Sequence, residues 1–174
     1  MTTYVVDAAH SEIQFKVKHL MISTVSGNFS QFDARMEAED ELFTNARISF
    51  EADVNSIQTG NEQRDGHLKS SDFFDASKYP KISFSSSSFT PKGESHYSME
   101  GLLTIRGNSK LVALDVKYLG KMTDFYGNEK HGFELNGKIN RKEFGLEWGA
   151  VTEAGGVVVS DEVRLHMNVQ MQKK

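Results

Sequence analysis

The chain has 174 residues, a formal net charge of −4, six histidines and no cysteine. This length is typical of one domain, so we expect a single domain over residues 1–174 with a stable core that needs no disulfide. Without cysteine, zinc–cysteine sites and iron–sulfur clusters are excluded. A mildly acidic chain without basic clusters between its aromatic residues is also not expected to bind nucleic acid.

The N-terminal residues contain no basic segment followed by an apolar run, and no stretch approaches the roughly 18 apolar residues of a membrane span. We therefore expect a soluble, cytoplasmic protein without membrane insertion. Nothing in the residues sets the oligomeric state, and a homodimer is compatible with the sequence.

Period-two alternation of apolar and polar residues predicts short strands along most of the chain. In the first half it predicts strands over residues 4–6, 12–18, 27–38 and 47–54. Residues 7–11 are suited to a bend, and a bulge is expected near Ser30, where two phenylalanines fall out of phase. Gly27 is expected to end the unclassified apolar run over residues 20–25.

The second half of the chain continues the same alternation. Strands are expected over residues 82–89, 133–139 and 163–171, and a hairpin over residues 97–121 with its turn at residues 106–109. Residues 91–93 are expected to turn the chain. A long glycine-rich connection over residues 141–156 holds the only tryptophan, Trp148.

One helix is expected at about residues 60–74, within the segment TGNEQRDGHLKSSDFFD. Thr59 followed three residues later by Glu62 is the pattern of a capping box. On a helical wheel, one face would carry Arg64, His67, Leu68, Ser71 and Phe74. A cation and an imidazole on an inward face would suit a polar anchor for a ligand. Alternatively, Arg64 pairs with a nearby carboxylate and His67 is a satisfied interior histidine.

About eight strands with one inserted helix predict an all-β fold, either an antiparallel barrel or a sandwich. A barrel of that size is wide enough to fill with its own side chains or to hold one small ligand, and periodicity leaves both open. The sequence contains no hydrolase elbow, P-loop, zincin or dinucleotide-binding motif, so we expect no catalytic residue and no enzyme. The six histidines lie on different predicted elements, and we expect no metal site.

Five segments, in order along nearly the whole chain, resemble the YceI-like family: DAAHSEIQFKVKHL (7–20), GNFSQFDA (27–34), NEQRDGHLKSSDFFDASKYPKISFSS (61–86), GLLTIRGNSKLVALDV (101–116) and INRKEFGL (139–146). The pattern R-D-x-H-L-x-S-x-D-F-F-D over residues 64–75 is the most specific of these matches. The resemblance implies a lipocalin-like, eight-stranded antiparallel barrel whose apolar interior holds a long-chain isoprenoid or related amphiphilic lipid. Many members resemble exported proteins, and the lack of a leader favours an intracellular member.

An apolar tail would enter such an interior with a driving force of about 0.8 kcal/mol per CH₂ group. We expect the lining to include Ile13, Phe15, Val17, Ile48, Phe50, Val54 and Phe84. The head group would need polar partners at the mouth, for which Arg64 and His67 are the first candidates and His19 the third.

Three functions follow from these expectations. The first is a carrier or sequestering module for an isoprenoid, quinone or fatty-acid-like lipid, with no other cofactor. The second is an enzyme acting on such a lipid, with His67 as base and Arg64 on an oxyanion or phosphate. The third is a structural or stress-related protein whose barrel is filled with side chains.

Overall fold

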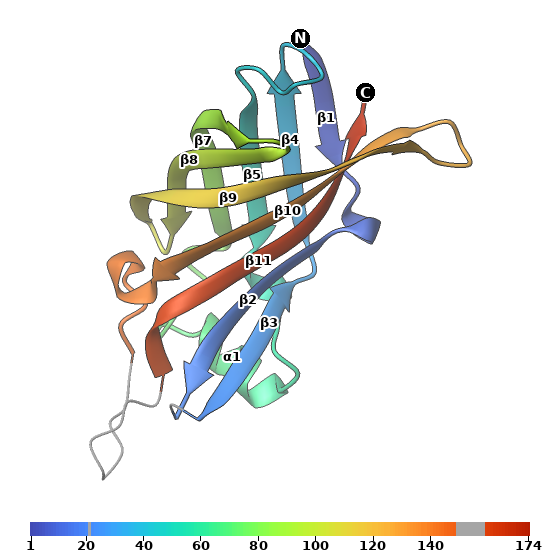
Figure 1. The fold of residues 1–174 in the computed structure, drawn as a ribbon. Helices are drawn as coiled ribbons and strands as arrows, with labels where there is room; N and C mark the ends of the chain where they lie inside the picture. Colours follow the sequence, from blue (N-terminus) through green and yellow to red (C-terminus); the bar gives the residue numbers. More distant parts are fainter. Residues whose placement is uncertain (21, 149–158) are drawn as a thin grey trace.

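Eight antiparallel strands follow one another around a closed ring in the computed structural model, which describes residues 1–20, 22–148 and 159–174 (Figure 1). In ring order they are β1 (Thr2–Val6), β4 (Phe32–Ala38), β5 (Arg47–Asp53), β7 (Lys81–Gly93), β8 (His96–Ile105), β9 (Asn108–Thr123), β10 (Glu129–Asn140) and β11 (Val159–Lys173). The ring closes because β11 pairs with both β10 and β1. This arrangement confirms the predicted eight-stranded antiparallel, lipocalin-like barrel.

Three further strands extend the wall at one end: β2 (Glu12–His19), β3 (Ser23–Phe29) and β6 (Ile57–Gln58). After the 3₁₀ turn η1 (Ala8–His10), β2 takes over from β1 the pairing with β11. Strand β3 leads into β4 across a break at Ser30 and Gln31. The pairs β1–β2 and β3–β4 therefore behave as two bent strands, with their irregular points at the predicted bend and bulge.

Two strand boundaries differ from the prediction. Gly27 does not end a run but lies inside β3, where a side-chain carbon would sit 2.3 Å from Cζ of Phe15 on β2. Glycine is needed there for close approach. Pro91 lies within β7 at a point where the pairing with β8 becomes irregular, a position that tolerates proline. The chain therefore turns at residues 94–95, later than predicted.

The helix α1 (Glu62–Lys69) is shorter than the predicted helix. Its N-cap is Asn61, whose side chain accepts a hydrogen bond from the backbone N–H of Arg64 at 3.0 Å, so the predicted cap at Thr59 is wrong. The helix ends at Ser70, which turns to extended backbone and donates its hydroxyl to the carbonyl of His67. No helix among the described residues is long and apolar enough to cross a membrane.

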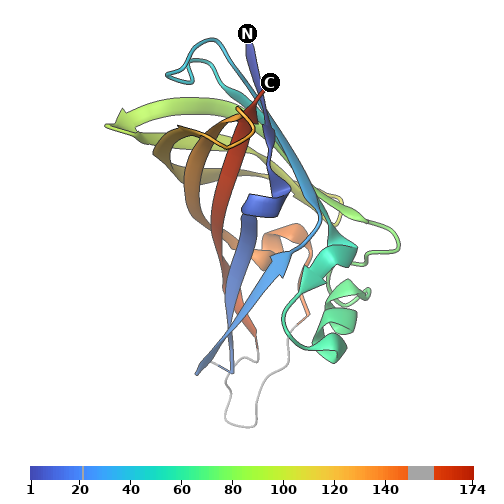
Figure 2. The same ribbon diagram turned by 90° about the vertical axis from the view of Figure 1, so that its right-hand side faces the viewer.

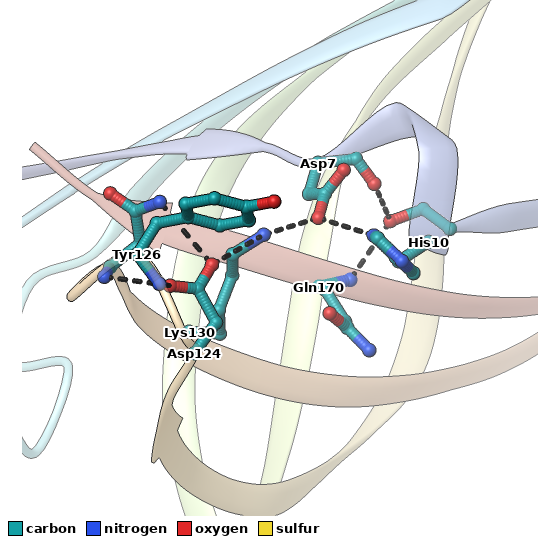
Figure 3. A network of polar contacts seen from close by, with 8 residues as sticks. Asp7, His10, Asp124, Tyr126, Lys130 and Gln170 are labelled. Atoms are coloured by element: carbon teal, nitrogen blue, oxygen red, sulfur yellow. Dashed lines mark hydrogen bonds and ion pairs between the residues drawn. The ribbon is translucent and has the colours of Figure 1, made fainter.

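The bend between β1 and β2 is fixed by a polar network around Asp7 (Figure 3). The carboxylate of Asp7 accepts a hydrogen bond from the largely buried ammonium of Lys130 on β10, and it lies 2.7 Å from Nδ1 of His10. The Ser11 hydroxyl donates to the carbonyl of Asp7 and accepts from the backbone N–H of Gln170 on β11. These hydrogen bonds link the bend to β10 and β11.

We expect Asp7→Asn to lower the free energy of unfolding at pH 7 by about 1.5 kcal/mol, because it removes a charged hydrogen bond. The hydrogen bond from Lys130, with a smaller contribution from His10, holds the pKa of the Asp7 carboxyl below its ordinary value. The ionised carboxylate therefore stabilises the folded state at every pH above its ordinary pKa. This contribution is lost as the pH falls through the lower pKa that the carboxyl has in the folded state.

Urea unfolding between pH 7 and acid pH tests this expectation. The difference in free energy of unfolding between the natural chain and Asp7→Asn should shrink below about pH 4. The control is Asp115→Asn, because Asp115 forms an exposed pair with Lys92 at 2.9 Å and should change stability by less than about 0.5 kcal/mol. Equal effects of the two substitutions would contradict the role assigned to Asp7.

Two glycines offer a matched test of the packing. A side-chain carbon at Gly101 of β8 would lie 2.5 Å from both Cζ of Phe84 and the carbonyl oxygen of Ser85. Gly101→Ala should therefore lower the free energy of unfolding by about 1 to 3 kcal/mol. Gly66 of α1 has open space around the same position, so Gly66→Ala should raise it by about 0.5 to 1 kcal/mol. If urea denaturation shows that both substitutions change the free energy of unfolding in the same direction, the packing described for β7 and β8 is refuted.

Candidate functional site

A cavity of about 240 Å³ runs through the interior of the barrel. Seven of the eight ring strands contribute side chains to its wall, as do β2, β3, Leu68 of α1, and Phe73 and Phe74 just after the helix. Among the 33 residues that line it, only Gln14 and Arg141 are not apolar. Because side chains alternate across each strand, the polar residues between these positions face outward.

Six of the seven residues predicted to line the interior do so: Ile13, Phe15, Val17, Ile48, Phe50 and Phe84. Val54 does not line the cavity, so its predicted placement is wrong. Strand β5 ends at Asp53, whose side chain accepts from the backbone N–H of Asn55 and caps the 3₁₀ turn η2 (Val54–Ser56). Val54 is buried within this turn instead.

One end of the cavity is sealed by aromatic side chains. Tyr4, Phe43 and His131 are each at most 1% exposed, and the ring of Phe43 contacts the ring of His131 edge-on. The Tyr118 hydroxyl lies 2.8 Å from Nδ1 of His131, and Nε2 of the same ring lies 2.8 Å from the Glu129 carboxylate. Both ring nitrogens of His131 thus have partners that hold the imidazole in place, whereas the buried hydroxyl of Tyr4 has no hydrogen-bond partner within the described residues.

The sequence analysis did not identify Phe43 as part of the interior. Phe43 belongs to the β4–β5 connection, which follows the acidic run at residues 39–41. An aromatic residue inside such a polar loop was the available signal. Its backbone adopts a positive φ of 60°, which turns the ring back into the barrel.

The opposite end of the cavity contains Arg141, which is 3% exposed and is the only charged lining residue in the part of the chain that the structure describes. Arg141 begins the 3₁₀ turn η3 (Arg141–Phe144) after β10. Its guanidinium donates to four backbone carbonyl groups, those of Leu146, Trp148, Val159 and Ser160. Burial lowers the pKa of Arg141 from its ordinary value, an effect that the nearby Asp161 opposes.

Arg141 therefore ties together the chain segments on both sides of residues 149–158. Residues 149–158 lie outside the described residues and include half of the predicted glycine-rich connection over residues 141–156. The sequence did not single out Arg141 as a buried residue. No charge partner close in sequence signals its burial, because its acceptors are main-chain oxygens.

The three residues predicted as polar contacts at the mouth do not line the cavity. Arg64 donates from Nε to the Thr59 hydroxyl at 2.8 Å and from Nη2 to the Thr59 carbonyl at 2.7 Å. His67 lies 2.8 Å from the Asp72 carboxylate, with its ring edge-on to Trp148. His19 ends β2. Arg64 and His67 therefore both have local partners, and their contact with a ligand stays a prediction.

Arg141→Met should lower the free energy of unfolding by about 3 kcal/mol, because it leaves several buried carbonyl groups without a donor. The matched control is Lys142→Met at the neighbouring position, where a half-exposed ammonium lies 3.4 Å from Asp161. That change should cost less than about 0.5 kcal/mol. Denaturant unfolding that ranks the two variants equally would contradict the role of Arg141.

Comparison with known proteins places the chain in a family. A family model described as "YceI-like domain" matches residues 4–171. A UPF0312 protein of Staphylococcus aureus (strain USA300) is 34% identical over 171 residues, covering 98% of this chain and 97% of that protein. The structure of BcnA from Burkholderia cenocepacia is 25% identical with a TM-score of 0.83, covering 95% of this chain and 98% of that chain.

A polyisoprenoid binding domain from Saccharophagus degradans shares the fold, with a TM-score of 0.68, 15% sequence identity and 98% coverage of each chain. The match of the family model to nearly the whole chain agrees with the resemblance read from the sequence segments. The chain belongs to the YceI-like family.

Proposed function

We propose that the protein binds the apolar chain of a long isoprenoid or similar amphiphilic lipid inside the barrel, and that it carries or sequesters this lipid. The observation that supports this most is the almost wholly apolar wall of the internal cavity. Each CH₂ group moved from water into such a wall gains about 0.8 kcal/mol. The fold neighbour described as a polyisoprenoid binding domain indicates that a barrel of this kind can accept such a ligand.

Binding is favoured over catalysis by the chemistry of the lining. Its two residues that are not apolar are Gln14, which has no titratable group, and Arg141, whose guanidinium is occupied by backbone carbonyls. General acid–base or nucleophilic catalysis needs a titratable or nucleophilic side chain at the bound molecule. His67, the base of the alternative enzyme hypothesis, pairs with Asp72 and lies behind Phe73, outside the cavity lining.

A cavity of about 240 Å³ also favours binding over the alternative of a barrel filled by its own side chains. Well-packed interiors contain few voids larger than a water molecule. An apolar space of this size lowers stability unless apolar atoms occupy it, because its lining loses dispersion contacts.

Calorimetric titration with geraniol, farnesol and geranylgeraniol, each one isoprene unit longer than the last, tests the proposal. The affinity should rise at least tenfold, or about 1.4 kcal/mol, with each added unit until the cavity is filled. A flat series, or no binding of any of the three alcohols, would contradict the proposal.

A cavity-filling variant locates the site. Ala34 lines the cavity on β4 and stands opposite Phe50, so Ala34→Phe should weaken the binding of geranylgeraniol at least tenfold. The control is Ala113→Phe, because Ala113 is exposed on β9 and lies outside the cavity wall. The interior is not the site if both variants bind like the natural chain.

A further inference from the structure

A second, polar groove lies on the outside of the barrel wall, between β3 and the start of α1. It is formed by residues 26–28 of β3, residues 58–62, Asp65 of α1, and Glu12 and Gln14 of β2. Figure 2 shows α1 at the same end of the barrel as the β2–β3 hairpin, opposite both chain termini. The groove therefore lies at the other end of the barrel from the aromatic seal formed by Tyr4 and Phe43.

The groove lies directly outside the wall of the internal cavity. Gln14 contributes to both, and the cavity side of the same elements is lined by Phe29 of β3 and Leu68 of α1. Within the described residues, β3 is paired on its second edge only at Asn28 and Phe29, by β6, so its first residues lack a strand partner on the side of α1. The groove and the cavity therefore adjoin at Gln14, beside the partly unpaired edge of β3.

The polar groups of the groove suit a ligand with several hydroxyl groups better than one with a phosphate. Four carboxamides line it, those of Gln14, Asn28, Gln58 and Asn61, each with a donor and an acceptor. The titratable side chains in its lining are three carboxylates, from Glu12, Glu62 and Asp65, and none is a cation. Several hydroxyl groups of one ligand could donate and accept here, whereas a phosphate would meet only negative charge.

Part of the groove is held rigid by its own hydrogen bonds. The Asp65 carboxylate accepts from the backbone N–H of Thr59 at 3.0 Å and from the Thr59 hydroxyl, and Asn61 caps the helix. Asn28 and Gln58 stand opposite each other on β3 and β6, and their side chains make no hydrogen bond within the described part of the chain. Two carboxamides are therefore available on a fixed frame.

We propose that this groove holds the head group of the bound amphiphile and selects an uncharged group rich in hydroxyls, such as a glycosyl group. The inference rests on the proposed function, because the tail of the same molecule occupies the internal cavity. It differs from the predicted head-group contact at Arg64, which lines neither the groove nor the cavity.

Calorimetric titration of the full chain with four ligands of equal tail, each below its critical micelle concentration, tests the proposal. The ligands are dodecanol, dodecyl glucoside, dodecyl phosphate and dodecylamine. Dodecyl glucoside should bind at least tenfold more tightly than each of the others. Tighter or equal binding of the phosphate or the amine would overturn the proposal, as would equal binding of dodecanol and the glucoside.

The double variant Asn28→Leu, Gln58→Met removes two carboxamides at nearly constant size. It should weaken the glucoside about tenfold, the loss expected for two hydrogen bonds, and leave dodecanol unchanged. Gln63→Met is the control, because Gln63 is exposed on α1 outside the groove. If the double variant binds the glucoside as tightly as the natural chain does, the head-group site is overturned but the proposed function is not. If dodecanol does not bind the natural chain, both the proposed function and this site are overturned.

Discussion

The pairing of β11 with both β1 and β2 closes the sheet, and the internal cavity exists only because of this closure. The register sets Leu165 opposite Phe15 and Val163 opposite Val17, so apolar side chains from both strands meet on the inner face. A slip of one residue would turn every one of them outward. The network around Asp7 holds the bend at which β11 passes from one partner strand to the next.

The closed barrel has two ends, and different residues occupy them. At the end near both termini, Tyr4, Phe43 and His131 form a buried aromatic seal. At the other end, Arg141 holds the segments around residues 146–148 and 159–160 together through main-chain oxygens.

The alternation of residue types was sufficient to predict most strands and six cavity-lining positions, because period two directly determines which face of a strand a side chain occupies. Alternation left a barrel and a sandwich equally open, and the resemblance to the YceI-like family favoured the barrel. The period-two pattern failed at Val54, where a capped turn replaces the strand. The helical wheel did not reveal the local partners of Arg64 and His67, because the hydrogen bonds to Thr59 and Asp72 depend on segments outside the helix. Arg141 could not be identified from local pattern, since two of its four acceptor carbonyls are at least 18 residues away along the chain.

The central claim is that the barrel interior binds a lipid. Native mass spectrometry of the protein purified without detergent from its own cells tests this most directly, when the same sample is also measured after denaturation. We expect the native mass to exceed the denatured mass by that of an amphiphilic molecule, which organic extraction then recovers. Identical native and denatured masses, together with a dodecanol titration that shows no binding, would contradict the claim.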